Sequence, residues 1–293
     1  MPDSQIKVDV VAWVEQVRAD STAYRQRQGV AIILNAIAAK SPLNHKMFLK
    51  GGILMGLAYD SPRQTVDIDL TTSLKAESNV GEWIREQLNE EMPSVADRLG
   101  YDELVTAVQS AKWQRGGFPD AAEFPALRLK VGYALRGTNQ EKALKRGRAA
   151  EVIGIDISFN ERLGHIQILA ITGGQELFAY GLADLIAEKY RAVLQQVTRN
   201  RNRQQDIFDL DLLISGNEIN EKLRTQILEI FIEKCRSRNL EPAQTSLDVP
   251  EVKERSGAKW ETMELEVGET PDFEGCYMRV SEFYESLPWD GFA

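Results

Sequence analysis

Two adjacent glycines, Gly51 and Gly52, are the first residues whose types and spacing suggest chemistry. Glycine lets the backbone turn tightly and approach a ligand closely, because no side chain stands in the way. The following residues, 53–59, are apolar and compatible with a helix, which would place both glycines at a helix N-terminus. The free N–H groups and the helix dipole at such an end suit a phosphate group.

Two aspartates follow the glycines on residues 65–71, which alternate in the manner of a strand. A period of two places Asp67 and Asp69 on the same face. Their carboxylates repel each other unless a cation lies between them, and Mg²⁺ is a hard ion that binds carboxylate and phosphate oxygens. The arrangement predicts a site for a nucleotide phosphate and a metal ion.

Each motif also has a simpler interpretation. A Gly-Gly pair is most often only a turn, and an Asp-x-Asp is most often a solvated strand edge, because short motifs have high false-positive rates. The order of the motifs (glycine turn, short helix, acidic strand) and their short separation favour the phosphate-and-metal interpretation.

The composition narrows the classes of function. A chain of 293 residues can bury one large core or two modest ones, and it has no apolar run as long as a membrane span. The formal net charge of −9 argues against indiscriminate nucleic-acid binding, although a local basic surface could still hold RNA. The only histidines, His45 and His165, exclude most Ser–His hydrolases and any multi-histidine metal centre.

The cysteines and the N-terminus add two expectations. Cys235 and Cys276 lie far apart without metal-ligand neighbours, which gives no sign of a disulfide framework or a zinc site. The N-terminal residues carry acids early and show no signal pattern, so we expect a cytoplasmic protein.

Apolar periodicity predicts the elements that must position these residues. Helices are expected over 5–19, 22–40, 79–92, 182–198, 204–215 and 219–238, and a final helix near 275–287. Strands are expected over 125–135 and 151–159. The charged connector 137–148 is interpreted as a solvated loop, segment 93–124 is mixed with turn residues at Pro93, Gly116-Gly117 and Pro119, and the tail beyond Pro242 is irregular.

The change of character near residue 180 predicts two closely joined parts. Residues 1–175 form an α/β domain with a mixed sheet, flanking helices and additional N-terminal helices. Residues 176–293 form a helical domain that completes the active-site cleft.

A third aspartate, Asp156, lies in the most hydrophobic predicted strand. A carboxylate there costs free energy unless it has a partner. If this strand neighbours the one that carries Asp67 and Asp69, the three carboxylates could hold two metal ions for an in-line phosphoryl displacement. The alternative is a strand-end aspartate bonded to a loop backbone.

Lys189 falls within the apolar stripe of its predicted helix. A lysine on an inward face either reaches the edge of the core or meets an anion such as a triphosphate. Asp206 shares a stripe with apolar residues of the next helix, and Arg203 lies just before it, so the three side chains could converge on one cleft. A structural salt bridge between two packed helices is the alternative. A nearby cluster of arginines suits RNA phosphates or the triphosphate itself: Arg191, Arg199, Arg201 and Arg203.

Three segments together resemble a known family. MFLKGGILMGLAYDSPRQTVDIDLTTS resembles the signature of the AbiEii/AbiGii toxin family, minimal nucleotidyltransferases related to DNA polymerase β. IGIDISFNE resembles the family's second acidic strand, and LADLIAEKYRAVLQQVTRNRNRQQDIFDLDLL is similar to its Ala-Glu-Lys helix and the Arg…Asp-x-x-Asp helix that follows. The late segment from Trp260 to Phe283 resembles the family's C-terminal ending.

The resemblance implies a nucleotidyltransferase fold and metal-dependent transfer of a nucleoside monophosphate from an NTP, with Mg²⁺ or Mn²⁺. In characterised relatives the acceptor can be the end of a tRNA, and the enzyme is the toxin of a toxin–antitoxin or phage-defence pair, which implies a cognate antitoxin. The implied roles are as follows: Asp67 and Asp69 are metal ligands, Gly51 and Gly52 the phosphate cradle, Lys189 a triphosphate contact, and Asp206 a catalytic or base-positioning residue. Arg63 and Thr65 occupy the family's basic and small hydroxyl positions before the acidic pair.

Two positions depart from the family pattern. Ile53 stands where members usually carry threonine, and Gly56 where many carry arginine. The first change removes a hydroxyl contact to phosphate and the second removes a charge, so nucleotide choice or rate could differ while the metal pair is intact.

We therefore expect a metal-dependent nucleotidyltransferase toxin that modifies tRNA. Asp67, Asp69 and Asp156 would hold the metal ions, with Asp156 otherwise taking the proton of the acceptor hydroxyl. Arg63, Thr65, Lys189 and Arg203 would bind the nucleotide. Two alternatives remain: a small molecule or protein hydroxyl as acceptor, and a non-catalytic nucleotide-binding module.

Overall fold

The computed structural model describes residues 4–114 and 123–291, which fall into two compact units. The first unit comprises Met1–Ala58, Thr65–Glu161 and Gln167–Ala179, and the second comprises Tyr59–Gln64, Arg162–Ile166 and Tyr180–Ala293. Two short segments, 59–64 and 162–166, thus belong to the second unit although the chain around them belongs to the first.

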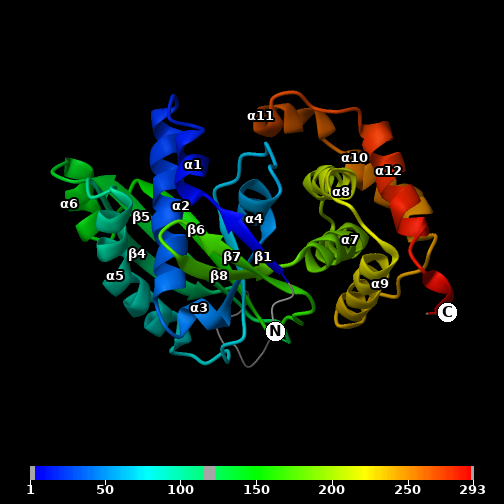
Figure 1. Cartoon of the computed structure of the whole chain (residues 1–293), viewed down its shortest axis with the longest axis horizontal. Helices are drawn as coiled ribbons and strands as arrows, with labels where there is room; N and C mark the ends of the chain where they lie inside the picture. The colour runs from blue at the N-terminus through cyan, green and yellow to red at the C-terminus, as the bar shows by residue number, and fades with distance from the viewer. Residues whose placement is uncertain (1–3, 115–122, 292–293) are drawn as a thin grey trace. The chain divides into compact units, whose positions relative to one another are not determined.

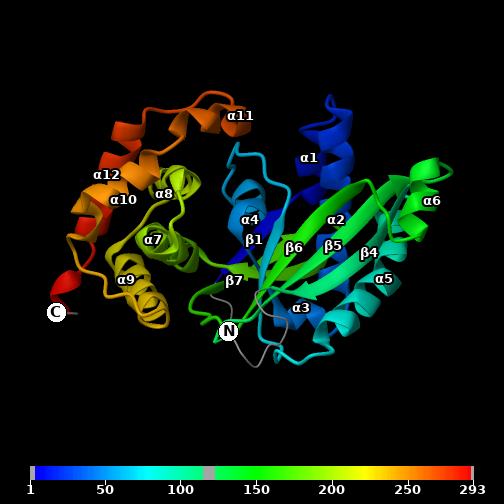
Figure 2. The ribbon, with the colours of Figure 1, turned by 180° about the vertical axis from the view of Figure 1, so that it is seen from behind.

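The first unit is built on a mixed sheet, which has eight strands among the described residues. In spatial order these are β1 (Ser4–Val8), β7 (Ile166–Ile171), β8 (Gln175–Tyr180), β2 (Met47–Lys50), β3 (Ile68–Thr72), β6 (Glu151–Phe159), β5 (Ala126–Leu135) and β4 (Leu104–Trp113). Its helices are α1 (Val10–Glu15), α2 (Ser21–Ala39), α3 (Leu43–Lys46), α4 (Gly51–Ala58), α5 (Val80–Leu99) and α6 (Asn139–Lys145). Figures 1 and 2, which view the chain from opposite sides, show α2 lying across one face of the sheet.

The centre of the sheet brings the acidic segments together. Strand β3 runs parallel to β6 and antiparallel to β2, and β5 runs antiparallel to β6. The register places Asp69 opposite both Lys50 and Asp156. The two acidic strands are therefore neighbours, which was the condition for the three-carboxylate hypothesis.

The second unit consists of helices around an aromatic core. They are α7 (Leu182–Arg199), α8 (Gln204–Gly216), α9 (Glu221–Arg236), α10 (Pro250–Gly257), α11 (Glu264–Val267) and α12 (Phe273–Glu285), with short 3-10 turns at Ser246–Asp248, Trp260–Met263 and Trp289–Gly291. The rings of Tyr190, Phe231 and Tyr284, from α7, α9 and α12, pack with centroids 5.1 to 6.1 Å apart. The hydroxyl of Tyr190 donates to the carbonyl of Val280, so its polar end is also paired.

Several elements differ from the sequence-based expectation. The helix expected over 5–19 is wrong at its start, because residues 4–8 pair in parallel with β7 and the helix begins only after Asp9, whose carboxylate caps it. The helix expected to end at 92 continues through Pro93 to Leu99, because the buried Val95 and Ala96 keep the following turn packed. The connector expected as a loop contains α6, which Thr138 caps.

Several further elements were not predicted from the sequence, namely the strands β2, β4, β7 and β8 and the helices α3, α10 and α11. Gly116-Gly117 and Pro119 lie outside the described residues. None of the helices described is both long enough and apolar enough to cross a membrane.

Candidate active site

The two glycines stand where a helix begins, as predicted. Helix α4 starts at Gly51, which has a φ of +70° that non-glycine residues rarely adopt. A Cβ at this position would lie only 2.8 Å from Cγ of Asp69, so glycine also leaves the space in which this carboxylate sits. The glycine turn and the Asp69 carboxylate are thus in direct contact.

Asp67 and Asp156 are joined by an arginine. Asp67 lies in a bend just before β3 instead of within the strand, so the predicted strand begins three residues later than expected. Nη2 of Arg128 lies 2.9 Å from Oδ2 of Asp67, and Nη1 lies 3.2 Å from Oδ2 of Asp156. Arg128 belongs to β5, where it stands directly opposite Asp156. The cation that these carboxylates require is therefore, in this structure, a guanidinium.

The environment of Asp156 changes its proton affinity. Burial raises its pKa above the ordinary value, and Arg128 acts in the opposite direction. The neighbouring charge of Asp67 raises it further, while a hydrogen bond from Nε2 of Gln114, 2.6 Å long, lowers it. Asp156 thus has the partners it was expected to need, and they are side chains of the sheet unit instead of a loop backbone.

The carboxylate oxygens of Asp67, Asp69 and Asp156 are the type of ligand atom that a hard divalent cation prefers. Carboxylate oxygens are what Mg²⁺ and Mn²⁺ prefer, and the missing Cβ atoms of Gly51 and Gly154 leave the room beside Asp69 and Asp67. Within residues 4–114 and 123–291, however, no three His, Cys, Asp or Glu side chains are gathered as a ready metal site. The expected three-carboxylate cluster is therefore not formed as it stands, because Arg128 lies between two of its members.

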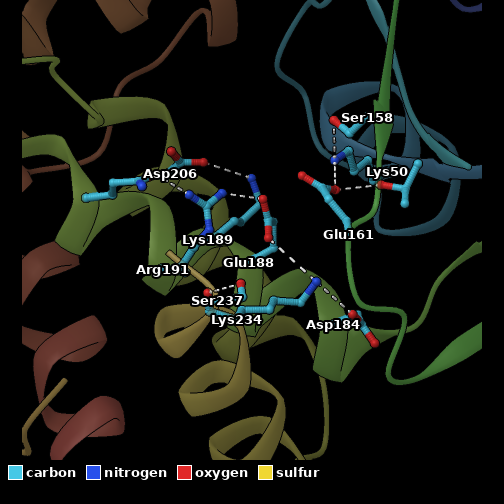
Figure 3. Close-up of polar contacts among 12 residues, drawn as sticks. Lys50, Ser158, Glu161, Asp184, Glu188, Lys189, Arg191, Asp206, Lys234 and Ser237 are labelled. Carbon is cyan, nitrogen blue, oxygen red and sulfur yellow. Dashed lines mark hydrogen bonds and ion pairs between the residues drawn. The ribbon is translucent and has the colours of Figure 1, made fainter. Parts of the chain in front are cut away.

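A second polar cluster adjoins the glycine turn. Nζ of Lys50 lies 2.5 Å from Oε2 of Glu161 and 3.2 Å from Oγ of Ser158 (Figure 3). Thr71 donates to the same Glu161 oxygen at 2.7 Å. The Lys50 and Glu161 side chains are each only 11% exposed. This ion pair fixes the end of β2, from which Gly51 continues.

The two family departures have different surroundings. The Ile53 side chain is fully buried in the core, so this position packs the helix and does not face a ligand. Gly56 is half-buried in the middle of α4. Thr65 lies in the irregular segment before β3.

The second unit gathers its charges around Asp209, which sequence reasoning did not single out. Nζ of Lys189 lies 2.5 Å from Oδ2 of Asp209 and 3.4 Å from Oδ1 of Asp206. Figure 3 shows Lys189 of α7 directed at Asp206 of α8. These contacts form a salt bridge between two packed helices, which was the alternative interpretation of Lys189. The expected proximity of Lys189 and Asp206 is also present.

Arg63 and Arg203 extend this cluster. Arg63 donates from Nε and Nη2 to the Asp209 carboxylate at 3.3 and 3.2 Å, while Arg203 lies 3.4 Å from Asp206. Burial acts to raise the pKa of Asp209, but the charges and hydrogen bonds of Lys189 and Arg63 outweigh it and hold the pKa below the ordinary value. Asp209 is therefore ionised and shared by two cations.

The predicted arginine cluster does not form one basic surface. Arg191 is buried and bonds to Glu188 and to Gln195, so it belongs to the interior of the helical unit. Arg199 and Arg201 are exposed near the end of α7.

The sequence contained signals for two of the missed residues. Arg128 sits at a polar position of an alternating strand, and Asp209 stands three residues after Asp206 on the same helix face. Neither signal names the partner, because the pairing depends on strand register and helix packing.

Comparison with protein families now assigns the class. The model of the family described as the nucleotidyl transferase AbiEii toxin of type IV toxin–antitoxin systems matches residues 32–279. The chain therefore belongs to this family: it is a nucleotidyltransferase toxin, and membership implies an NTP substrate and an antitoxin partner. A comparison with curated proteins finds no match.

Solved structures share the fold. The chain is similar to MenT4, a nucleotidyltransferase toxin from Mycobacterium tuberculosis, with a TM-score of 0.59 and 17% identity over 96% of this chain and 91% of that one. It is also similar to JHP933 from Helicobacter pylori, with a TM-score of 0.50 and 12% identity over 92% of each chain. The predicted mixed α/β nucleotidyltransferase fold is thus confirmed.

Proposed function

We propose that this toxin uses Mg²⁺ to transfer a nucleoside monophosphate from an NTP to a hydroxyl of tRNA. The observation that carries the proposal is the placement of Asp69 against the glycine turn and opposite Asp156 on the neighbouring strand. Asp67, just before β3, is linked to Asp156 through Arg128. Carboxylates beside a helix N-terminus suit a metal-bound triphosphate.

The residues of the first unit have separate roles in this reaction. Asp67, Asp69 and Asp156 would hold the metal, which when bound would neutralise and orient the triphosphate. The backbone N–H groups at Gly51 and Gly52 donate to phosphate oxygens. The acceptor hydroxyl attacks the α-phosphorus, the bond to pyrophosphate breaks, and the hydroxyl proton passes to Asp156 unless this residue is fully engaged with metal. The raised pKa of Asp156 supports a base role, since a stronger base accepts the proton more readily.

Residues of the helical unit are proposed to serve the nucleotide. Lys189 and Arg203 offer positive charge to the triphosphate, and Asp206 holds both of them. Among the described residues the buried Nε of Arg203 has no hydrogen-bond partner, which leaves a donor for an anion. Arg63 acts through Asp209, to which it is bonded. Thr65, which belongs to the first unit, offers a hydroxyl to the nucleotide.

The tRNA acceptor rests on the family resemblance and on the exposed Arg199 and Arg201. Incubation with each α-³²P-labelled NTP, Mg²⁺ and total RNA tests reaction and acceptor together. Label should enter tRNA-sized RNA with the wild type and with Asp97→Asn, an exposed aspartate of α5, but not with Asp69→Asn. Far-UV circular dichroism verifies that both variants fold.

Three outcomes would count against the proposal. Label found only in small metabolites or protein would overturn the tRNA acceptor, whereas undiminished transfer by a folded Asp69→Asn would overturn the metal site. Nucleotide binding without turnover on any acceptor would contradict the enzyme activity itself and return the chain to a binding module.

A further inference from the structure

Arg128 occupies the position between the two carboxylates where the metal is expected. Its two Nη atoms contact Oδ2 of Asp67 and Oδ2 of Asp156, one each. The strand register fixes its backbone opposite Asp156, while its side chain is 40% exposed. The head group is thus held by ion pairs from a rigid base and retains access to solvent.

Gly154 shows that this contact is built into the sheet. A Cβ at Gly154 would lie 2.5 Å from Oδ1 of Asp67 and 2.7 Å from Nη2 of Arg128, closer than real Cβ atoms approach. Any side chain there would displace the guanidinium or the carboxylate. Because Gly154 has no side chain, there is space for the ion pair between Arg128 and Asp67. This observation supports the ion pair in addition to its short N–O distance.

A guanidinium and a divalent metal cannot use these oxygens together. Mg²⁺ binds carboxylate oxygens at about 2.0–2.1 Å and demands near-octahedral geometry, which a bound guanidinium on the same oxygens obstructs. The two cations also repel each other. Phosphate oxygens, in contrast, match the planar fork of arginine as well as carboxylates do.

We propose that Arg128 is a competing counter-ion that closes the carboxylate site in the nucleotide-free enzyme and moves onto the triphosphate when the metal enters. Metal then binds together with the nucleotide instead of before it. The inference rests on the proposed metal role of Asp67 and Asp156. It assigns Arg128 to the coupling between metal and nucleotide, which no purely structural salt bridge would provide.

The test measures Mn²⁺ binding by the loss of the free-ion signal in electron paramagnetic resonance, with and without an α,β-imido NTP that cannot be cleaved. The variants are Arg128→Gln, Arg128→Lys and Asp67→Asn. Lys130→Gln is the matched control, because Lys130 is an exposed cation two residues along the same strand. Circular dichroism verifies folding of each.

We expect Arg128→Gln to bind Mn²⁺ alone about tenfold more tightly than the wild type, a factor that corresponds to roughly 1.4 kcal/mol. Arg128→Lys, which keeps one charge but loses the fork, should fall between them, and Lys130→Gln should stay within about threefold of the wild type. The imido NTP should tighten Mn²⁺ binding strongly in the wild type and much less in Arg128→Gln.

The outcomes separate this inference from the function on which it rests. If Asp67→Asn loses Mn²⁺ binding while Arg128→Gln binds it no better than the wild type, the metal site stands and the role of Arg128 is overturned. If Asp67→Asn binds Mn²⁺ as tightly as the wild type, the metal site itself is wrong.

Discussion

Replacing Asp209 by asparagine should destabilise the protein severely, because it removes the one charge that Lys189 and Arg63 share. The Asp209 side chain is fully buried, and those of Lys189 and Arg63 are only 7% and 10% exposed. Asparagine keeps the size and one acceptor oxygen of the side chain. The substitution therefore changes charge far more than packing.

The structure sets the magnitude of this effect. After the change, Lys189 retains Asp206 at 3.4 Å and Arg63 retains Glu266 at 3.6 Å, so neither cation is left without a carboxylate. Removing one partner of a buried ion pair costs about 3–5 kcal/mol. Because these secondary contacts remain, we expect a loss of about 3 kcal/mol in the free energy of unfolding.

A matched control lies two residues further along the same helix. Asp211 pairs with Arg279 through two contacts of 2.6 and 2.7 Å, a geometry better than that around Asp209, but Arg279 is 47% exposed. Exposed pairs contribute only about 0.2–1 kcal/mol. Asp211→Asn should therefore cost less than about 1 kcal/mol, although it removes the shorter contacts.

Urea unfolding of the wild type and both variants provides the measurement. Circular dichroism and tryptophan fluorescence should be followed together, because a chain of two units need not unfold in one step. If Asp209→Asn is no more destabilising than Asp211→Asn, burial does not decide the strength of these pairs and the reasoning is refuted.

The same comparison has a defined pH dependence. The pKa of Asp209 is lower in the folded protein than in the unfolded chain, so its contribution to stability is fully present above the unfolded value of about 3.9. It is lost as pH falls through the folded pKa. The stability difference between the wild type and Asp209→Asn should thus be constant between about pH 5 and 8 and shrink only in stronger acid.

Further substitutions and a thiol assay test other parts of the structure. Gly51→Ala and Gly147→Ala introduce a side chain at φ of +70° and +72°, at a similar strain of about 1–2 kcal/mol, but only Gly51→Ala also brings a Cβ against Asp69. Calorimetric titration should show loss of Mg²⁺-dependent NTP binding for Gly51→Ala alone; equal binding by both would contradict the contact. Burial raises the pKa of Cys235 and of Cys276 to about 12, so neither should react with Ellman's reagent at pH 8 until urea unfolds the chain, and fast reaction of the native protein would disagree with their burial.

Local patterns predicted the parts of the site that are close in sequence. The glycine turn, helix α4 and the acidic strand were predicted because tight turns, apolar helices and alternating strands leave direct signatures. The pairing of β3 with β6 was considered as a hypothesis, since an aspartate in a hydrophobic strand must find a partner. Each of these inferences requires only residues that are close in sequence, or the rule that a buried carboxylate needs a polar or charged partner.

The rest depends on contacts between distant segments. Residues 4–8 form a strand only because β7, more than 150 residues later, offers a parallel partner, whereas their apolar spacing with Val10 and Trp13 also fits a helix. Arg128 meets Asp156 through the register of β5 on β6, and a slip of one residue would turn it to the opposite face. Such a register cannot be read from alternation, which gives the face of a residue but not its neighbour.

The two charge clusters differ in how easily they can exchange partners, and this difference bears on their roles. In the first unit the paired side chains are 29% to 47% exposed, so water solvates the ions while a contact breaks and the exchange costs little. In the second unit Asp209 is fully buried between Lys189 and Arg63, and separating either pair would leave an unsolvated charge. We therefore expect the guanidinium of Arg128 to move during the reaction cycle, whereas Lys189 stays on Asp209 and acts on a nucleotide as a fixed positive charge.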